Sequence, residues 1–291
     1  MKVFVTGVCG QLGHDVMHEL KKRGIEAVGS DLAPDAGIAL DITDAAAVER
    51  VLGEVRPDAV IHCAAWTAVD AAEDADKQER VYAVNAAGTG NLARVCGQLD
   101  AKMLYLSTDY VFDGTGEAPW QPDCRDFSPL NVYGKSKLEG EKAVAEALEK
   151  FFIVRIAWVF GKNGRNFIRT MLSLSEKYDT LRVVRDQIGT PTYTLDLARL
   201  LVDMILTDKY GYYHATNEGG YISWYEFACE IFRQAGKNMH VIPVTTAEYG
   251  LSKAARPFNS RLDKAKLTDA GFEPLPHWQD ALARYLKEIE E

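Results

Sequence analysis

The sequence contains few cysteines, no long apolar run and no excess of positive charge. Its five cysteines, at Cys9, Cys63, Cys96, Cys124 and Cys229, form no C-x-x-C pair and show no metal-ligand spacing with histidine. They therefore predict reduced thiols in a cytoplasmic protein, and neither a disulfide framework nor a metal site. No apolar run is long enough to cross a bilayer, and we expect no signal peptide.

The charge balance argues against two classes of partner. Lys and Arg number 33 against 42 Asp and Glu, which gives a formal net charge of −9. Because such a surface repels phosphate backbones and anionic lipids, we expect neither nucleic acid nor a membrane as a partner. An anionic substrate would then need a local cluster of basic groups. The chain is long enough, at 291 residues, for one domain plus a smaller lobe.

The N-terminus has the pattern of a dinucleotide-binding turn. Met1–Thr6 is typical of a short buried strand, and a Gly-x-x-Gly-x-x-Gly turn leads from it into an amphipathic helix that ends at Gly24. This order lets the backbone approach a pyrophosphate at the helix N-terminus, where free N–H groups attract anions. The alternative is a tight turn with no ligand. We predict that the dinucleotide contacts Gly7, Gly10, Gln11, Leu12 and Gly13.

Acidic residues follow the next two apolar segments. The strand predicted over 25–29 ends at Asp31, where dinucleotide folds place an acceptor for the adenosine ribose. Asp31 would repel a 2′-phosphate, and no Lys or Arg occurs between Gly24 and Glu49, so NADH is favoured over NADPH. The alternative is that Asp31 is a simple turn residue. Asp41 and Ile42 are predicted to flank the adenine.

Strands and helices alternate with short connections, which predicts an α/β fold, a doubly wound parallel sheet of the Rossmann type. The expected helices are 45–55, 76–99, 136–150 and 195–206, and the expected strands are 59–64, 103–106 and 152–156. Ala64 and Ala65 lack bulk, so a cofactor can pass close to them. Asn85 is either a polar bracket near the floor of the site or a structural residue of its helix.

The pattern loosens after residue 157, where we expect a smaller C-terminal substrate lobe. We assign 1–157, with a return segment near 190–216, to the dinucleotide-binding domain, and 158–189 and 217–291 to the lobe. Trp158 directly follows a strand and either stacks on the substrate or packs in the core. Asn166 belongs to a basic loop that enters a helix. Arg256 and Arg261 suit bidentate recognition of a diphosphate, although either can simply be solvated.

Tyr133 and Lys137 are the strongest candidates for chemistry. One helical turn separates them, so a phenol and an ammonium can face the same cleft. We expect the cation to lower the pKa of the phenol toward the working range and to make Tyr133 a general acid/base. Thr108, at the end of a strand, adds a hydroxyl for a reacting oxygen. Tyr249 and Lys253 repeat the spacing, but no strand and hydroxyl pair precede them.

Six segments together resemble the dTDP-4-dehydrorhamnose reductases of the extended short-chain dehydrogenase/reductase superfamily, over essentially the whole chain. They are 7–13, 107–114, 133–141, 155–161, 186–192 and 256–260. The resemblance implies Thr108, Tyr133 and Lys137 as the catalytic trio and Trp158 as a substrate-pocket residue. Related sugar-nucleotide dehydratases carry Asp-Glu after the threonine. Asp109 and Tyr110 stand here instead, which fits reduction without elimination, and we assign both to the substrate site.

The implied reaction is the NADH- or NADPH-dependent reduction of dTDP-4-dehydro-L-rhamnose at C4, which yields dTDP-L-rhamnose for cell-surface polysaccharide. Two alternatives stay open. One is another nucleotide-sugar reductase or epimerase of the same fold, and the other is a regulatory subunit like that of methionine adenosyltransferase. Some members of the family bind Mg²⁺ at a homodimer interface through acidic residues, and Asp15 falls near one such position, so Mg²⁺ and a homodimer are further expectations.

Overall fold

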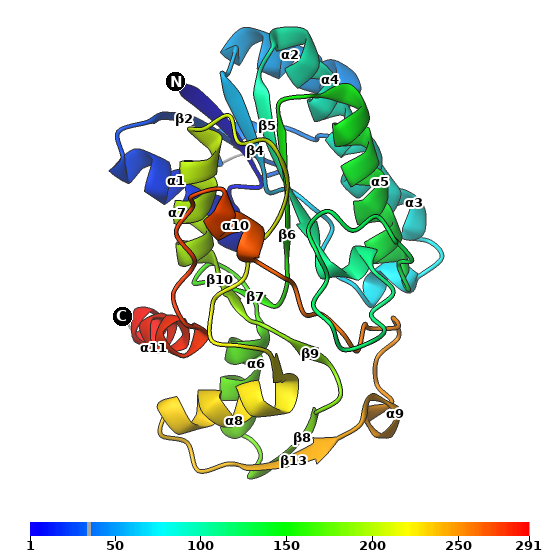
Figure 1. Cartoon of the computed structure of the whole chain (residues 1–291), viewed down its shortest axis with the longest axis vertical. Coiled ribbons are helices and arrows are strands. Elements are labelled where there is room, and N and C mark those ends of the chain that lie inside the picture. The colour runs from blue at the N-terminus through cyan, green and yellow to red at the C-terminus, as the bar shows by residue number, and fades with distance from the viewer. Residues whose placement is uncertain (34–35, 291) are drawn as a thin grey trace.

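A parallel sheet organises the larger part of the protein (Figure 1). The structure, a computed structural model, describes residues 1–33 and 36–290, and among these the main sheet has seven strands in the order β11-β6-β5-β4-β1-β2-β3. Every pairing in it is parallel. The strands are β1 (Lys2–Thr6), β2 (Glu26–Asp31), β3 (Ile38–Ala39), β4 (Ala59–His62), β5 (Lys102–Thr108), β6 (Phe151–Ile156) and β11 (Gly211–His214).

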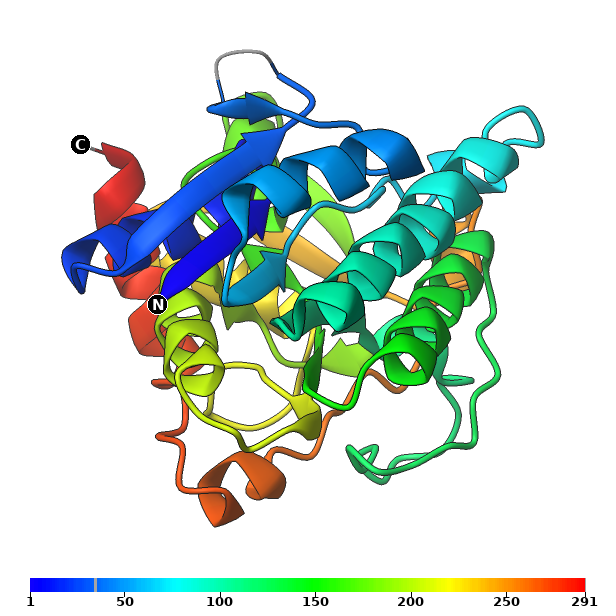
Figure 2. The same ribbon diagram turned by 90° about the horizontal axis from the view of Figure 1, so that it is seen from above.

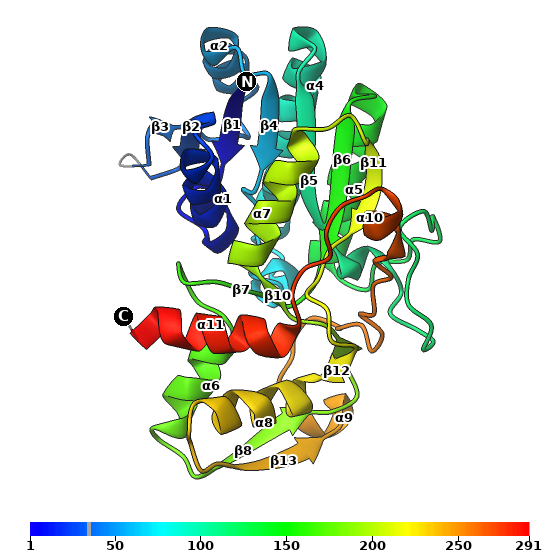
Figure 3. The same cartoon turned by 60° about the vertical axis from the view of Figure 1, so that its left-hand side comes forward.

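Helices cover both faces of this sheet, as the two turned views show (Figures 2 and 3). Successive strand residues point to opposite faces, so Val3 and Val5 pack toward α1 (Gln11–Lys22) and α7 (Thr194–Ile205). Phe4, between them, packs on the other side with α2 (Ala45–Val55), α4 (Thr89–Leu99) and α5 (Val132–Ala147). The doubly wound α/β fold expected from the sequence is confirmed.

A smaller lobe lies at one end of the sheet and has its own apolar core (Figure 1). Its helices are α6 (Phe167–Ser175), α8 (Trp224–Gln234) and α11 (Trp278–Glu290), with the short α9 (Thr246–Tyr249) beside β8. The short α10 (Ala265–Asp269) instead packs on β11 of the main sheet through Leu267. Strands β8 (Thr180–Val184) and β13 (His240–Val244) pair in parallel. The pairs β7 (Val159–Phe160) with β10 (Thr192–Tyr193) and β9 (Ile188–Gly189) with β12 (Ile222–Ser223) are shorter. The residue boundaries of the two domains stay a prediction.

The long helix expected over 76–99 is interrupted. It comprises α3 (Gln78–Tyr82), a π-helical turn η2 (Ala83–Gly88) and α4. The side chain of Asn85, in the π turn, accepts from Trp66 N and donates to the hydroxyl of Ser136 on α5. These hydrogen bonds to other segments of the chain are made at the irregular turn. The sequence pattern did not indicate the interruption.

Two other boundaries differ slightly from expectation. Strand β5 continues through Thr108, and α5 ends at Ala147. Short 3-10 turns, η1 (Ala71–Glu73) and η3 (Asp109–Val111), follow β4 and β5. In the described part of the chain, no helix has both the length and the apolar character that a membrane crossing needs.

Candidate active site

A cavity of about 730 Å³ lies at the carboxyl ends of the parallel strands. That edge is where open α/β sheets bind ligands. Its walls come from the ends of β1, β2, β4, β5 and β6, from α5, and from α8 of the lobe. The predicted residues that line it are Gly7, Gly10, Gln11, Leu12, Gly13, Asp31, Asp41, Ile42, Ala64, Ala65, Thr108, Asp109, Tyr110, Tyr133, Lys137 and Trp158.

The glycine turn leaves room for a dinucleotide. Gly7 has φ +73°, a conformation that side chains disfavour, and a Cβ on it would meet Ala64 N at 2.6 Å. A Cβ on Gly13 would lie 2.1 Å from Gly7 O. Helix α1 begins at Gln11 with no side-chain cap, so its first N–H groups are open to an anion. These features fit a pyrophosphate-containing cofactor.

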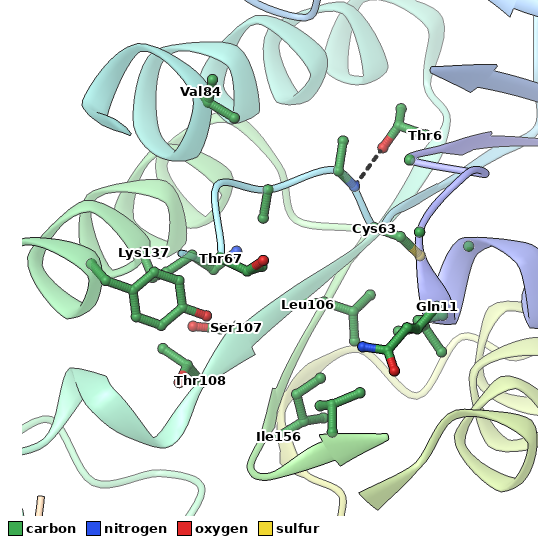
Figure 4. Close-up of a pocket in the computed structure, with 18 of the residues that line it drawn as sticks. Thr6, Gln11, Cys63, Thr67, Val84, Leu106, Ser107, Thr108, Lys137 and Ile156 are labelled. Carbon is green, nitrogen blue, oxygen red and sulfur yellow. Dashed lines mark hydrogen bonds between the residues drawn. The ribbon is translucent and has the colours of Figure 1, made fainter. Parts of the chain in front are cut away.

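The turn is also tied to the segment that leads into the lobe. The amide oxygen of Gln11 accepts from Gly161 N at 2.9 Å and from the Asn166 side chain at 3.1 Å. Figure 4 shows Gln11 near Leu106 and Ile156, with Thr108 and Lys137 farther along the same cavity. The cofactor turn and the reacting end are therefore parts of one continuous cavity.

Two carboxylates and one guanidinium stand at the end of the cavity where the sequence predicts the adenosine. Asp31 accepts from Cys9 N at 2.9 Å and from Leu32 N at 2.7 Å. Asp41 is paired with Arg80 of α3, with Nη2 and Oδ2 2.8 Å apart. Burial is the largest single influence on the pKa of Asp41 and would raise it. The hydrogen bonds from Arg80 and Thr43 together outweigh burial, so the pKa is lowered. Arg80 lies outside the stretch from residue 24 to residue 49 that lacks Lys and Arg, and it reaches Asp41 from another element.

Thr108 and Asp109 meet at the end of β5, beside the reacting end of the cavity. Asp109 is 2% exposed. Its Oδ1 accepts from the Thr108 hydroxyl at 2.9 Å, and that hydroxyl also accepts from Tyr110 N at 3.2 Å. The other carboxyl oxygen of Asp109 is buried with no hydrogen-bond partner.

Helix α5 presents Tyr133 and Lys137 to the same space. Asn131 caps the helix by accepting from Gly134 N at 2.8 Å, which places Tyr133 in the first turn. The Lys137 ammonium is 3% exposed and stands 4.1 Å from the centre of the Tyr105 ring, a cation–π contact. Tyr133 meets the ring of Tyr110 edge-on at 5.7 Å. The phenol and the ammonium therefore both border the cavity.

The expected effect of Lys137 on Tyr133 is wrong for this structure. Burial, together with the negative charge of Asp109, raises the pKa of Tyr133, and a hydrogen bond from Thr108 offsets this only in part. Burial also lowers the pKa of Lys137 to about 7. The sequence argument considered one neighbouring cation, but desolvation disfavours the charged form of both groups. At neutral pH the phenol is consequently a proton donor.

Two indole rings form the wall on the lobe side. Trp158 and Trp224, on α8, are stacked with ring centres 3.7 Å apart, and both line the cavity. Trp158 has φ +50°, a strained conformation for a bulky residue. A Cβ on Gly189 would approach its ring to 2.9 Å, so glycine is required there. Trp158 thus packs against its neighbours and still faces the cavity.

Asn85 and Asn166 do not line the cavity. The amide of Asn85 is engaged by Trp66 and Ser136, so it has the structural role that was the alternative. Asn166 caps α6 and donates to Gln11, Gly161 and Tyr285. Their amides are fully used in holding elements together.

The two arginines expected at a diphosphate are also outside the lining. Arg256 makes a bidentate pair with Asp70, at 3.0 and 2.7 Å, and Arg261 donates to Asn259 at 3.0 Å. Sequence position alone did not indicate the acidic and polar partners that engage them. The repeated Tyr249/Lys253 spacing is not helical either, because α9 ends at Tyr249 and Gly250 is left-handed.

Asp15, the residue near the expected Mg²⁺ position, is engaged by a threonine of α7. It is 4% exposed, and its Oδ2 accepts from the Thr194 hydroxyl at 2.5 Å. Within residues 1–33 and 36–290, no three His, Cys, Asp or Glu side chains are grouped so as to hold a metal. The Mg²⁺ site at a homodimer interface that the resemblance raised stays a prediction.

Sequence reasoning missed several lining residues. Among them are Cys63, Thr67, Arg80, Val84, Arg165 and Trp224. Thr67 had a local signal, a hydroxyl just beyond the end of β4. Arg80 and Trp224 had none, because long-range folding alone brings α3 and α8 to the cavity.

The cavity has space for a dinucleotide beside a buried phenol and ammonium, and it lies at the carboxyl edge of a doubly wound sheet. This combination defines the class of NAD(P)-dependent oxidoreductases of the short-chain dehydrogenase/reductase type. A family model described as "RmlD substrate binding domain" matches residues 1–291. The chain belongs to this family, and the kinship with dTDP-4-dehydrorhamnose reductases expected from the sequence is confirmed.

Known relatives match along nearly their whole length. The chain is 42% identical over 286 residues to a dTDP-4-dehydrorhamnose reductase of Streptomyces griseus, covering 96% of this chain and 90% of the relative. It is 39% identical to the spore coat polysaccharide biosynthesis protein SpsK of Bacillus subtilis, covering 99% and 97%. The crystal structure of a Clostridium acetobutylicum dTDP-4-dehydrorhamnose reductase superposes with a TM-score of 0.94 at 40% identity, covering all of both chains. The Bacillus anthracis reductase, solved with NADP, gives 0.92 at 40% identity and covers 99% of both.

Proposed function

We propose that the protein reduces the C4 ketone of dTDP-4-dehydro-L-rhamnose to give dTDP-L-rhamnose, with a nicotinamide dinucleotide as the reductant. The observation that carries the proposal is the convergence of Thr108, Tyr133 and Lys137 with the open glycine turn in one cavity. The names of three relatives at 38–42% identity, each a dTDP-4-dehydrorhamnose reductase, support the choice of substrate.

A bound nicotinamide supplies the hydride, and residues of this chain handle the proton. Tyr133, protonated because its pKa is raised, donates its proton to the oxygen that becomes the C4 hydroxyl. Lys137, as a cation, stabilises the phenolate that remains. Thr108 donates a hydrogen bond to the same oxygen and stabilises its developing charge. The indole wall of Trp158 and Trp224 excludes water from this end.

The turn from Gly7 to Gly13 would hold the pyrophosphate, and Asp31 and Asp41 the adenosine. The Asp31 carboxylate supports NADH, because a 2′-phosphate would face a second negative charge there. The ratio of kcat/KM for NADH to that for NADPH measures this preference directly. A ratio below one would contradict the assignment of Asp31.

The test of the reaction is oxidation of the reduced cofactor, followed by its absorbance, with dTDP-4-dehydro-L-rhamnose made in place by the enzymes that produce it. Tyr133→Phe should lower kcat by about 10²-fold or more, the usual scale for loss of a general acid. Tyr249→Phe is the matched control, from the second Tyr-x-x-x-Lys sequence, and should retain wild-type turnover. Near-normal turnover by Tyr133→Phe would contradict the mechanism.

Absence of turnover would change the substrate assignment. If protein that binds the cofactor shows no turnover, the substrate is wrong, and other nucleotide sugars with a ketone are the next probes. A copurifying partner chain together with no turnover on any of them would favour a regulatory subunit.

A further inference from the structure

The carboxyl group of Asp109 is an unusual part of the cavity wall. It is 2% exposed, it lines the cavity, and its Oδ2 is buried with no hydrogen-bond partner. No Lys or Arg forms an ion pair with it among the described residues. A buried carboxylate without a counter-ion is expensive, so such groups are usually protonated or serve a function.

The neighbour that it does contact is Thr108. A threonine hydroxyl has one proton to donate and two lone pairs with which to accept. In the structure that hydroxyl accepts from Tyr110 N and lies 2.9 Å from Asp109 Oδ1. An ionised carboxylate can only accept, so it takes the single proton of Thr108. Thr108 then has no proton left for the reacting oxygen of a substrate.

Protonation of Asp109 reverses this bond. The carboxylic acid donates to the Thr108 oxygen, and the threonine proton is released toward the cavity. We propose that Asp109 is a positioning residue that, in its protonated form, directs the Thr108 hydroxyl proton to the reacting oxygen. The proposal rests on the reduction proposed above. It adds no transferred group, because Tyr133 still donates the proton and both Thr108 and Asp109 keep theirs.

The surroundings raise the share of the protonated form above that of an exposed aspartate. The groups that face the carboxyl are the phenols of Tyr133 on α5 and Tyr110 on η3, together with Ser260, which does not reach Oδ2 in hydrogen-bonding geometry. Arg256, paired with Asp70, acts on the pKa of Tyr110. Burial raises the pKa of Asp109 to about 6, although the nearby hydroxyls of Ser260 and Thr108 oppose the shift.

The sign of the pH dependence follows. Asp109 is protonated below its raised pKa, and Lys137, whose pKa burial lowers to about 7, is a cation below that value. Both active forms are therefore lost as the pH rises. With saturating NADH, a plot of log kcat/KM against pH should approach a slope of about −2 on its alkaline side.

The first experiment compares this slope in three variants. Asp109→Asn has no titrating proton, so its slope should be about −1, which leaves only Lys137. Thr108→Val has no hydroxyl to direct, so it should also show about −1, and adding Asp109→Asn to it should change the slope no further. An Asp109→Asn enzyme that keeps the wild-type slope would overturn the proposal, as would a second loss of slope in the double variant.

The second experiment does not depend on turnover. An infrared pH titration follows the C=O stretch of protonated carboxyl groups, and the wild-type spectrum minus that of Asp109→Asn isolates one residue. We expect a carboxylic acid band that disappears around pH 6, well above the usual titration of an aspartate. Disappearance near pH 4 instead would refute the inference even if the reductase activity were established.

Discussion

Breaking the buried ion pair of Glu141 and Arg155 should damage both stability and catalysis. Arg155 is 0% exposed and Glu141 is 1% exposed, and the guanidinium grips the carboxylate at 2.8 and 2.7 Å. The pair joins α5 to β6, and Glu141 stands one helical turn after Lys137. Glu141→Gln keeps the shape of the side chain but leaves a buried guanidinium without its counter-ion.

The size of the effect follows from that burial. Removing one partner of a buried pair costs about 3–5 kcal/mol, far more than loss of an exposed pair. At roughly 2–4 °C per kcal/mol for a chain of this size class, Tm should fall by roughly 10 °C. The Lys137 cation is affected too, because burial lowers its pKa to about 7 and the charge of Glu141 partly opposes that shift. Without the charge, the alkaline loss of activity should begin at lower pH.

Urea unfolding, calorimetry and pH–rate profiles measure these changes. Glu139→Gln is the control on the same helix, since Glu139 is paired with Lys142 at 2.8 Å but is half exposed, and it should stay within about 1 kcal/mol of wild type. Replacing Glu141 and Arg155 together by Leu and Met should recover most of the stability, because no unpaired charge remains. A Glu141→Gln protein as stable as the Glu139→Gln control would refute the reasoning.

Three other substitutions test the cofactor end and the catalytic helix. Arg80→Ala removes the ion-pair partner of Asp41. Because that pair is half exposed, steady-state kinetics should show KM for the cofactor raised about two- to fivefold with kcat unchanged. A fall in kcat would count against a role of Arg80 in cofactor binding alone. Asn131→Asp keeps the cap of α5 but loses the 2.8 Å hydrogen bond from the Asn131 amide to a backbone carbonyl of the lobe. The free energy of unfolding in urea should fall by about 1–3 kcal/mol. An unchanged urea midpoint would exclude a stabilising role for this bond. Gly13→Ala should abolish cofactor binding in a fluorescence titration, since its Cβ would lie 2.1 Å from a backbone oxygen, whereas Gly53→Ala, with no atom within 4 Å, should bind normally.

Much of the fold was predictable because its signals are local. The short buried strand at the N-terminus follows from the apolar residues of β1, and Gly7 and Gly13 of the following turn stand where no Cβ fits. The spacing of Tyr133 and Lys137 is a property of a single helix, so their shared face followed from the sequence. The π-helical turn at Asn85 was not visible, because it depends on bonds to Trp66 and Ser136.

The amino-acid sequence by itself determined the order of the elements, the glycine turn, the family and the side chains that we propose as catalytic. Tertiary structure decided how those side chains are charged and which others join them. Arg80 reaches Asp41 across 39 residues, and Asp70 engages Arg256 across 186. The pKa of Tyr133 rises because burial and Asp109 act on it together. Desolvation and long-range charge pairing exist only once distant segments have packed, so no local pattern encodes them.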